Sequence, residues 1–120
     1  MGWALIGNKA CLSFIKISSF VSTELTKLSR YSRISVPSLV RFIVAIYLKN
    51  YLRRGQMERI SFKPYKQIQV KFPDDTYRKL VEIAQHTGIH LNELVGMILE
   101  WYFRSGQYKK NFGELYPENS

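Results

Sequence analysis

Cysteine is almost absent from this 120-residue chain, in which Cys11 is the single example. One thiol forms neither an intrachain disulfide nor a thiolate metal cluster, so disulfide-stapled folds are excluded and an intracellular, cytoplasmic protein is favoured. Histidine is nearly as scarce, with two examples. His86 and His90 lie four positions apart without a third ligand nearby, which argues against zinc. We therefore expect neither a metal nor a cofactor.

Long apolar runs and catalytic signatures are also missing. The longest apolar run, 42–48, is far shorter than the roughly 20 residues that span a bilayer. The beginning of the chain mixes Leu5 with Asn8 and Lys9 and so lacks the apolar core of a signal peptide. The sequence shows no glycine-rich phosphate loop, no paired carboxylates in apolar surroundings and no Ser/His/acid signature. It predicts a soluble protein that is not an enzyme.

Acidic residues are few relative to basic ones. Nine Asp and Glu face 18 Lys and Arg, which gives a net charge of +9 and a pI near 9.8. The excess lies in the first half, because 13–54 contains 8 basic residues and 1 acid whereas 67–104 contains 4 basic residues and 5 acids. Such a balance favours a polyanionic partner, either nucleic acid or an anionic membrane surface.

The chain contains an internal repeat. When it is shifted by 55 positions, residues 15–17 align with 70–72, and nearly every apolar residue in the first half meets an apolar residue in the second. Each half has a short strand-like segment followed by two helical segments. One such unit has too small a core and leaves a strand edge exposed. We therefore predict a mainly α fold with a two-stranded antiparallel β-ribbon, in which two units form an intramolecular pseudo-dimer.

Local signals set the expected bounds of these units. We expect an N-terminal extension over 1–11, a first unit over 12–54, a linker over 55–66, a second unit over 67–104 and a C-terminal tail over 105–120. Within the first unit, the pattern predicts a strand over 12–17 and helices over about 20–31 and 36–53. Within the second unit it predicts a strand over 67–72, which Pro73 ends, and two helices separated by Gly88.

The second unit carries a characteristic order of motifs. After the strand come Pro-Asp-Asp at 73–75, a helix with Leu80 and Ile83, Thr-Gly-Ile at 87–89 and His-Leu-Asn-Glu-Leu-Val at 90–95. This order resembles the ribbon-helix-helix repressors of the MetJ/Arc group, and the tandem form resembles regulators known from archaeal viruses. In that family a two-stranded ribbon enters the DNA major groove. The resemblance implies a sequence-specific transcription regulator whose partner is double-stranded DNA.

The resemblance also implies that outward-facing strand residues contact bases. In the second strand these are Gln67, Gln69 and Lys71. Their chemistry agrees, because Gln pairs with the N6/N7 edge of adenine and Lys with the O6/N7 edge of guanine.

The first strand departs from that pattern. Its outward positions by the 55-residue shift are Leu12, Phe14 and Lys16, of which Lys16 is a conventional base reader. Phe14 either touches a thymine methyl group or is buried by the N-terminal extension. A register slip of one residue would instead bury Lys16 and expose Ile15 and Ile17. We expect asymmetric recognition, with Phe14 and Lys16 as the base-contacting residues of this strand.

Phosphate contacts are expected at the N-termini of the second helices, where free N–H groups and the helix dipole favour anions. The candidates there are Ser35, Ser38, His90 and Asn92. Lys27, Arg30 and Arg33 surround the first inter-helix turn and are candidates for gripping the flanking backbone, although a solvated basic face explains each of them equally well.

Two alternative functions remain, together with an expectation about how many chains bind one DNA site. An antitoxin-like interaction module would bind a partner through the tail 107–120, which carries Tyr108, Phe112 and Tyr116. An amphipathic protein on a membrane surface would use the basic, aromatic first half, although a core helix explains that pattern at least as well, and we expect no membrane association. Because one ribbon offers few base readers, we also expect two or more chains to associate on DNA.

Overall fold

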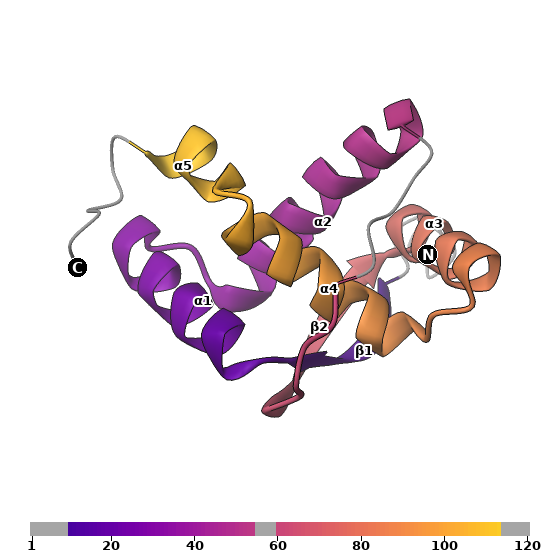
Figure 1. Ribbon diagram of the computed structural model, residues 1–120, viewed down its shortest axis with the longest axis horizontal. Coiled ribbons are helices and arrows are strands. Elements are labelled where there is room, and N and C mark those ends of the chain that lie inside the picture. Colours follow the sequence, from indigo (N-terminus) through magenta and orange to yellow (C-terminus); the bar gives the residue numbers. More distant parts are fainter. Residues whose placement is uncertain (1–9, 55–59, 114–120) are drawn as a thin grey trace, which may run out of the picture.

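The computed structural model describes residues 10–54 and 60–113, with side chains from 11–50 and 60–113. The elements follow one another as β1 (Ala10–Ile17), α1 (Ser19–Ser32), α2 (Val36–Arg54), β2 (Lys66–Pro73), α3 (Asp74–Thr87), α4 (Leu91–Arg104) and α5 (Gln107–Phe112) (Figure 1). The order strand, helix, helix thus occurs twice and a short helix follows. The predicted mainly helical fold with a two-stranded antiparallel sheet is confirmed.

The predicted strands and first-unit helices agree with the structure to within two residues at each end. β1 begins at Ala10 rather than at position 12, and β2 gains one residue at each end relative to 67–72. The expected tail departs more, because 107–112 forms α5. Patterns of apolar residues mark where an element packs, and they say less about where its hydrogen bonds end.

The two strands pair antiparallel over their full length. Phe14 lies opposite Gln69, Ile15 opposite Ile68, and the pairing runs from Ala10–Pro73 to Ile17–Lys66. Ile15 and Ile17 are 0% and 1% exposed, which excludes the slipped register. The inward face of the ribbon is therefore the face that the alternation of the sequence predicts.

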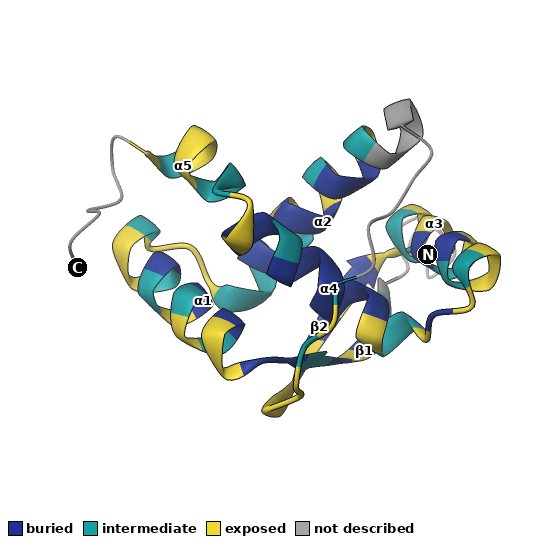
Figure 2. Ribbon diagram, in the orientation of Figure 1, coloured by how far each residue is buried: buried dark blue, intermediate teal, exposed yellow. Residues whose placement is uncertain are grey.

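The core lies between this inward face and the helices. Val70 and Phe72 of β2 join Ile15 and Ile17 on it, and all four are almost fully buried. Figure 2 shows buried residues concentrated along α2 and α4, which cross near the centre, while α1 and α3 flank them and carry exposed outer faces. α4 is buried without interruption from Leu94 to Phe103 except at Trp101, so it is the central helix of the fold.

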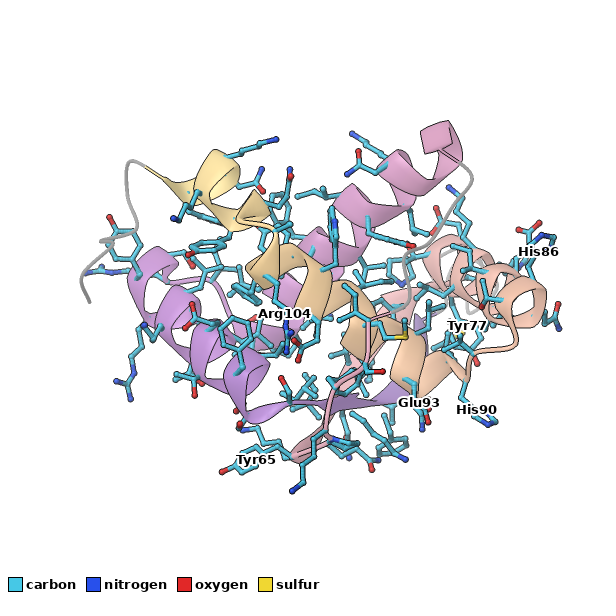
Figure 3. All side chains as sticks on the ribbon, in the orientation of Figure 1. Tyr65, Tyr77, His86, His90, Glu93 and Arg104 are labelled. Carbon is cyan, nitrogen blue, oxygen red and sulfur yellow. The ribbon has the colours of Figure 1, made fainter. Side chains whose placement is uncertain are left out.

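One charged residue, Glu100 of α4, is completely buried. Its Oε1 accepts a hydrogen bond from the hydroxyl of Ser18, and its Oε2 accepts one of 2.6 Å from Nε of Arg104. Ser18 also caps α1, because its Oγ accepts the N–H of Val21 at 3.1 Å. The Arg104 guanidinium lies 5.8 Å from the ring centroid of Phe20, and Figure 3 shows Arg104 between α4 and α1. These contacts tie the start of α1 to the C-terminal half of α4.

Replacing Glu100 with Gln is expected to lower the free energy of unfolding by about 1–2 kcal/mol. The amide keeps the shape and one acceptor but loses the charge, and hydrogen bonds to charged groups contribute about 1.5–3 kcal/mol. We take the lower part of that range because the Arg104 side chain is half exposed and solvent weakens its ion pair. Urea denaturation followed by circular dichroism measures the change. Glu82→Gln, at an exposed position of α3, is the matched control, and an equal effect of both would contradict the structural role.

α5 packs against its own chain. The hydroxyl of Tyr102 donates a hydrogen bond of 2.8 Å to Asn111 Oδ1, and burial raises the pKa of the Tyr102 phenol. The rings of Phe42 and Phe112 meet edge to face at 5.9 Å. Two of the tail aromatics, Tyr108 and Phe112, therefore pack partly against the core. The third, Tyr116, lies outside the described residues.

Candidate nucleic-acid interface

The outward face of the ribbon carries every strand residue that the sequence nominated as a base reader. Gln67, Gln69 and Lys71 of β2 are exposed, and Lys16 of β1 is half-buried. Phe14 is 45% exposed. The N-terminal extension that one of the two alternatives placed over it lies for the most part outside the described residues. Strand geometry places these side chains on one face because alternate residues point to the same side.

The register divides this outward face into three cross-strand pairs. They are Lys16–Gln67 at one end, Phe14–Gln69 in the centre and Leu12–Lys71 at the other end. We call these residues the ribbon face. None of them is acidic, and one lysine lies toward each end. Leu12 is 48% exposed, so the apolar members lie on β1 and the amides on β2.

The N-terminus of α2 lies beside the ribbon face. The hydroxyl of Ser35 donates to Ser38 Oγ at 3.0 Å, and the N–H of Ser38 lies 3.4 Å from Ser35 Oγ. Arg41 then connects this helix start to β2, because Nη2 donates to Ser38 Oγ and Nη1 to the carbonyl of Lys71, each at 3.1 Å. Two predicted phosphate contacts, Ser35 and Ser38, are thus held near one end of the ribbon face.

Arg41 is a residue that the sequence analysis missed as part of this site. It falls between apolar neighbours of a core helix and reads there as a charged interruption. Its position one turn after Ser38 places Arg41 near the start of the helix, but the sequence does not show that the guanidinium reaches β2. That contact depends on how α2 packs against β2. The guanidinium adds positive charge at the helix N-terminus.

The N-terminus of α4 is less favourable for an anion than that of α2. His90 is exposed at the N-cap position and its side chain makes no capping hydrogen bond, while Asn92 is half-buried. Figure 3 shows His90 and Glu93 at the lower edge of the molecule, and the exposed carboxylate of Glu93 repels phosphate. We expect His90 and Asn92 to contribute less than Ser35 and Ser38.

The basic residues around the first inter-helix turn differ among themselves. Lys27 pairs with Glu24 at 3.5 Å, which neutralises part of its charge. Arg30 and Arg33 are exposed, and Arg33 has a left-handed backbone with φ of 62° at the end of α1. Arg33 lies two positions before Ser35, so it extends the basic surface outward from the start of α2.

The residues just before β2 form a second feature that the sequence analysis missed. Tyr65, assigned there to the linker, donates its N–H to the carbonyl of Ile17 at 2.8 Å and so continues the pairing beyond the ribbon. Figure 3 shows Tyr65 at the lower end of the molecule. Its side chain is 66% exposed, and its sequence neighbours Lys63 and Lys66 are also exposed. An aromatic residue within a basic segment next to a predicted strand is the signal that was available.

A pocket of about 340 Å³ lies between the segment before β2 and the start of α4. Its walls include Ile60, Phe62, Pro64, Ile89, His90 and Met97. In the described ranges 10–54 and 60–113, no group of three or more His, Cys, Asp or Glu residues is placed to hold a metal ion. Within the same ranges no single helix is both long and apolar enough to cross a membrane, and the one helix pair that passes on length and composition, 19–32 with 36–50, is bent by 104°.

The ribbon face therefore combines lysines, amides and two apolar side chains on one exposed surface next to a helix N-terminus. Its chemistry has to be interpreted from this chain alone. No family model matches the chain, and no curated protein and no solved structure matches it.

Proposed function

We propose that the protein is a sequence-specific transcription regulator that inserts the ribbon β1–β2 into the major groove of double-stranded DNA. The observation that carries the proposal is the ribbon face, whose charged, amide and apolar side chains project together from two strands and are exposed or half-buried among the described residues. The major groove admits a two-stranded β-ribbon, and these side-chain types read base edges there. The start of α2, with Ser35, Ser38 and Arg41, would hold a backbone phosphate and fix the register.

The proposal includes a tandem ribbon-helix-helix pseudo-dimer. Phe14 and Gln69 are 55 positions apart, which is the shift of the sequence repeat, and they lie opposite each other in the ribbon. Equivalent residues therefore face each other at the ribbon centre. Arg41 and Gly96 are also 55 apart, and they approach the carbonyls of Lys71 and Lys16, which are again equivalent positions. These relations support an approximate two-fold axis between the two halves.

Binding of the purified protein to a random-sequence duplex tests the proposal. We expect affinity to fall steeply with salt, with a slope of log K against log salt of about −4 or steeper, because each neutralised phosphate contributes about −0.9. Fluorescence anisotropy from about 50 to 200 mM salt measures this slope. Vesicles containing anionic lipid serve as the comparison. Binding to vesicles without binding to the duplex would contradict the proposal and favour the membrane-surface alternative.

Several chains on one DNA site form part of the same proposal. A single ribbon face offers three pairs of side chains, and each good bidentate contact discriminates by about 1–3 kcal/mol. Two or more ribbons side by side would read a longer site. Sedimentation of the complex with a selected site gives the stoichiometry, and one chain per site would contradict this part.

A further inference from the structure

The centre of the ribbon face places an amide next to an aromatic ring. Gln69 of β2 is exposed, and Phe14 of β1 lies directly opposite it with 45% of its surface exposed. Directly opposite residues of an antiparallel pair have Cβ atoms about 4.5–5.5 Å apart, so both side chains reach one surface patch. Leu12, two residues before Phe14 on the same face, is similarly exposed.

This apolar exposure needs an explanation that packing does not give. Phe14 and Leu12 lie in the middle and at one end of a strand whose other face buries Ser13, Ile15 and Ile17, and polar residues at both positions would leave the core unchanged. Within the described residues, the partner strand offers Gln69 and Lys71 as their cross-strand neighbours. A surface that is apolar on one strand and hydrogen-bonding on the other matches a ligand with both characters.

We propose that Gln69 and Phe14 together read a single A·T base pair, and that Leu12 contacts a further thymine methyl group, so that the stretch recognised by one chain is non-palindromic. In the major groove an A·T pair presents the N7 acceptor and N6 donor of adenine beside the O4 and 5-methyl group of thymine. Gln forms two hydrogen bonds with the adenine edge, and an apolar side chain contacts the thymine methyl. Phe14 and Gln69 offer these two groups side by side.

The two ends of the ribbon face also differ in whether they present an apolar side chain. Lys16 and Gln67 present only hydrogen-bonding groups, whereas the opposite end pairs Lys71 with Leu12. An exact two-fold axis would place identical residues at both ends, and the sequence does not. Each chain must therefore bind its stretch of DNA in one orientation, with the further thymine methyl group under Leu12. The charge of Lys16 and Lys71 attracts the duplex at either end of the face.

This inference rests on the proposed function, and its test separates the two. A duplex site is first selected from random DNA with the unmodified protein. Each thymine is then replaced in turn by uracil, which removes only the methyl group, and each adenine by 7-deazaadenine, which removes only the N7 acceptor. We expect about fourfold weaker binding at each methyl that is read, the equivalent of one buried methylene group. Loss of the N7 hydrogen bond is expected to weaken binding about fivefold.

The variants Phe14→Ala, Leu12→Ala and Gln69→Ala assign the contacts. Phe14→Ala should bind the thymine and uracil forms of one position equally, and Gln69→Ala should lose the 7-deaza effect at the adenine of that same base pair. All three side chains lie on the exposed face, and matching thermal unfolding curves check that each variant is folded. Phe14→Leu, which keeps an apolar group, should retain part of the uracil effect.

The outcomes are distinct. Specific binding with no uracil-sensitive position, or with uracil effects that persist unchanged in both Phe14→Ala and Leu12→Ala, would overturn this inference and leave the proposed function standing. A palindromic stretch under a single chain, delimited by the uracil and 7-deaza effects, would also overturn it. Absence of any salt-dependent duplex binding would overturn the proposed function and this inference with it.

Discussion

Replacing Gly96 with alanine is expected to lower the free energy of unfolding by about 2 kcal/mol. A Cβ atom at position 96 would overlap the carbonyl oxygen of Lys16 and come within 2.5 Å of Cζ of Phe62. The Phe62 ring is the end of a side chain and is able to turn, whereas Lys16 is held in the ribbon opposite Gln67. α4 would have to move away from β1. Overpacking of this kind costs about 1–3 kcal/mol, sometimes more.

The same substitution also improves the helix, and the controls separate the two effects. Alanine is favoured over glycine in a helix interior by about 1 kcal/mol. Ala45→Gly, at an exposed position of α2, measures that contribution in this protein. Phe62→Ala, made alone and in the Gly96→Ala background, removes the ring contact, and we expect alanine at position 96 to remain destabilising there because the Lys16 carbonyl stays in place. Urea denaturation of the five proteins gives the values. A Gly96→Ala protein that is more stable than the parent by as much as Ala45→Gly is less stable would mean that α4 does not approach β1 this closely.

Gly96 also shows where the sequence stops being informative about the fold. The alternation at 67–72 and the helical spacing of apolar residues predict both strands and both helix pairs, because each element has to bury one face. The antiparallel ribbon follows from the exposed edges of two short strands. A glycine inside a helix, however, reads as a weak helix former. That it permits a close approach to Lys16 becomes visible only when α4 and β1 are placed together.

Buried polar contacts were unpredictable for a similar reason. Glu100 follows Ile98 and Leu99 and reads as a solvated residue at the edge of an apolar face, yet it is completely buried. Its partner Ser18 lies 82 positions earlier in the sequence. The repeat gives no help, because positions 45 and 73, which correspond to Glu100 and Ser18, hold alanine and proline. Contacts that break the symmetry of a repeat cannot be inferred from one half and transferred to the other.

The candidate site was predictable in its strands and less so at its margins. Alternation alone selects Gln67, Gln69 and Lys71 as outward, since their neighbours need the core. Arg41 and Tyr65 join the site through backbone carbonyls of Lys71 and Ile17, and such contacts depend on tertiary packing rather than on residue type. The predicted linker, 55–66, therefore extends too far toward the C-terminus, because Tyr65 and Lys66 already pair with β1.

Replacing both Gln69 and Lys71 with alanine is expected to reduce the preference for a selected DNA site over random DNA by about 100-fold. Each of the two side chains would lose one base contact, and a good bidentate contact discriminates by about 1–3 kcal/mol, where 1.4 kcal/mol corresponds to a factor of ten. Binding to random DNA should fall much less, because it depends on phosphate contacts, and of these two residues only Lys71 carries charge. Fluorescence anisotropy with both duplexes at one salt concentration gives the ratio.

The helix α3 offers a matched control for this variant. Gln85 and Lys79 are exposed there and have the same side chains, so Gln85→Ala with Lys79→Ala removes the same amide and the same charge away from the ribbon. We expect that control to keep the preference for the selected site and to lose only a little affinity for any DNA. Both residues of the test pair are also outward-facing, so neither change opens a cavity in the core. An equal loss of specific and non-specific binding in the Gln69 and Lys71 variant would mean that the ribbon holds the duplex through its charge and reads no bases.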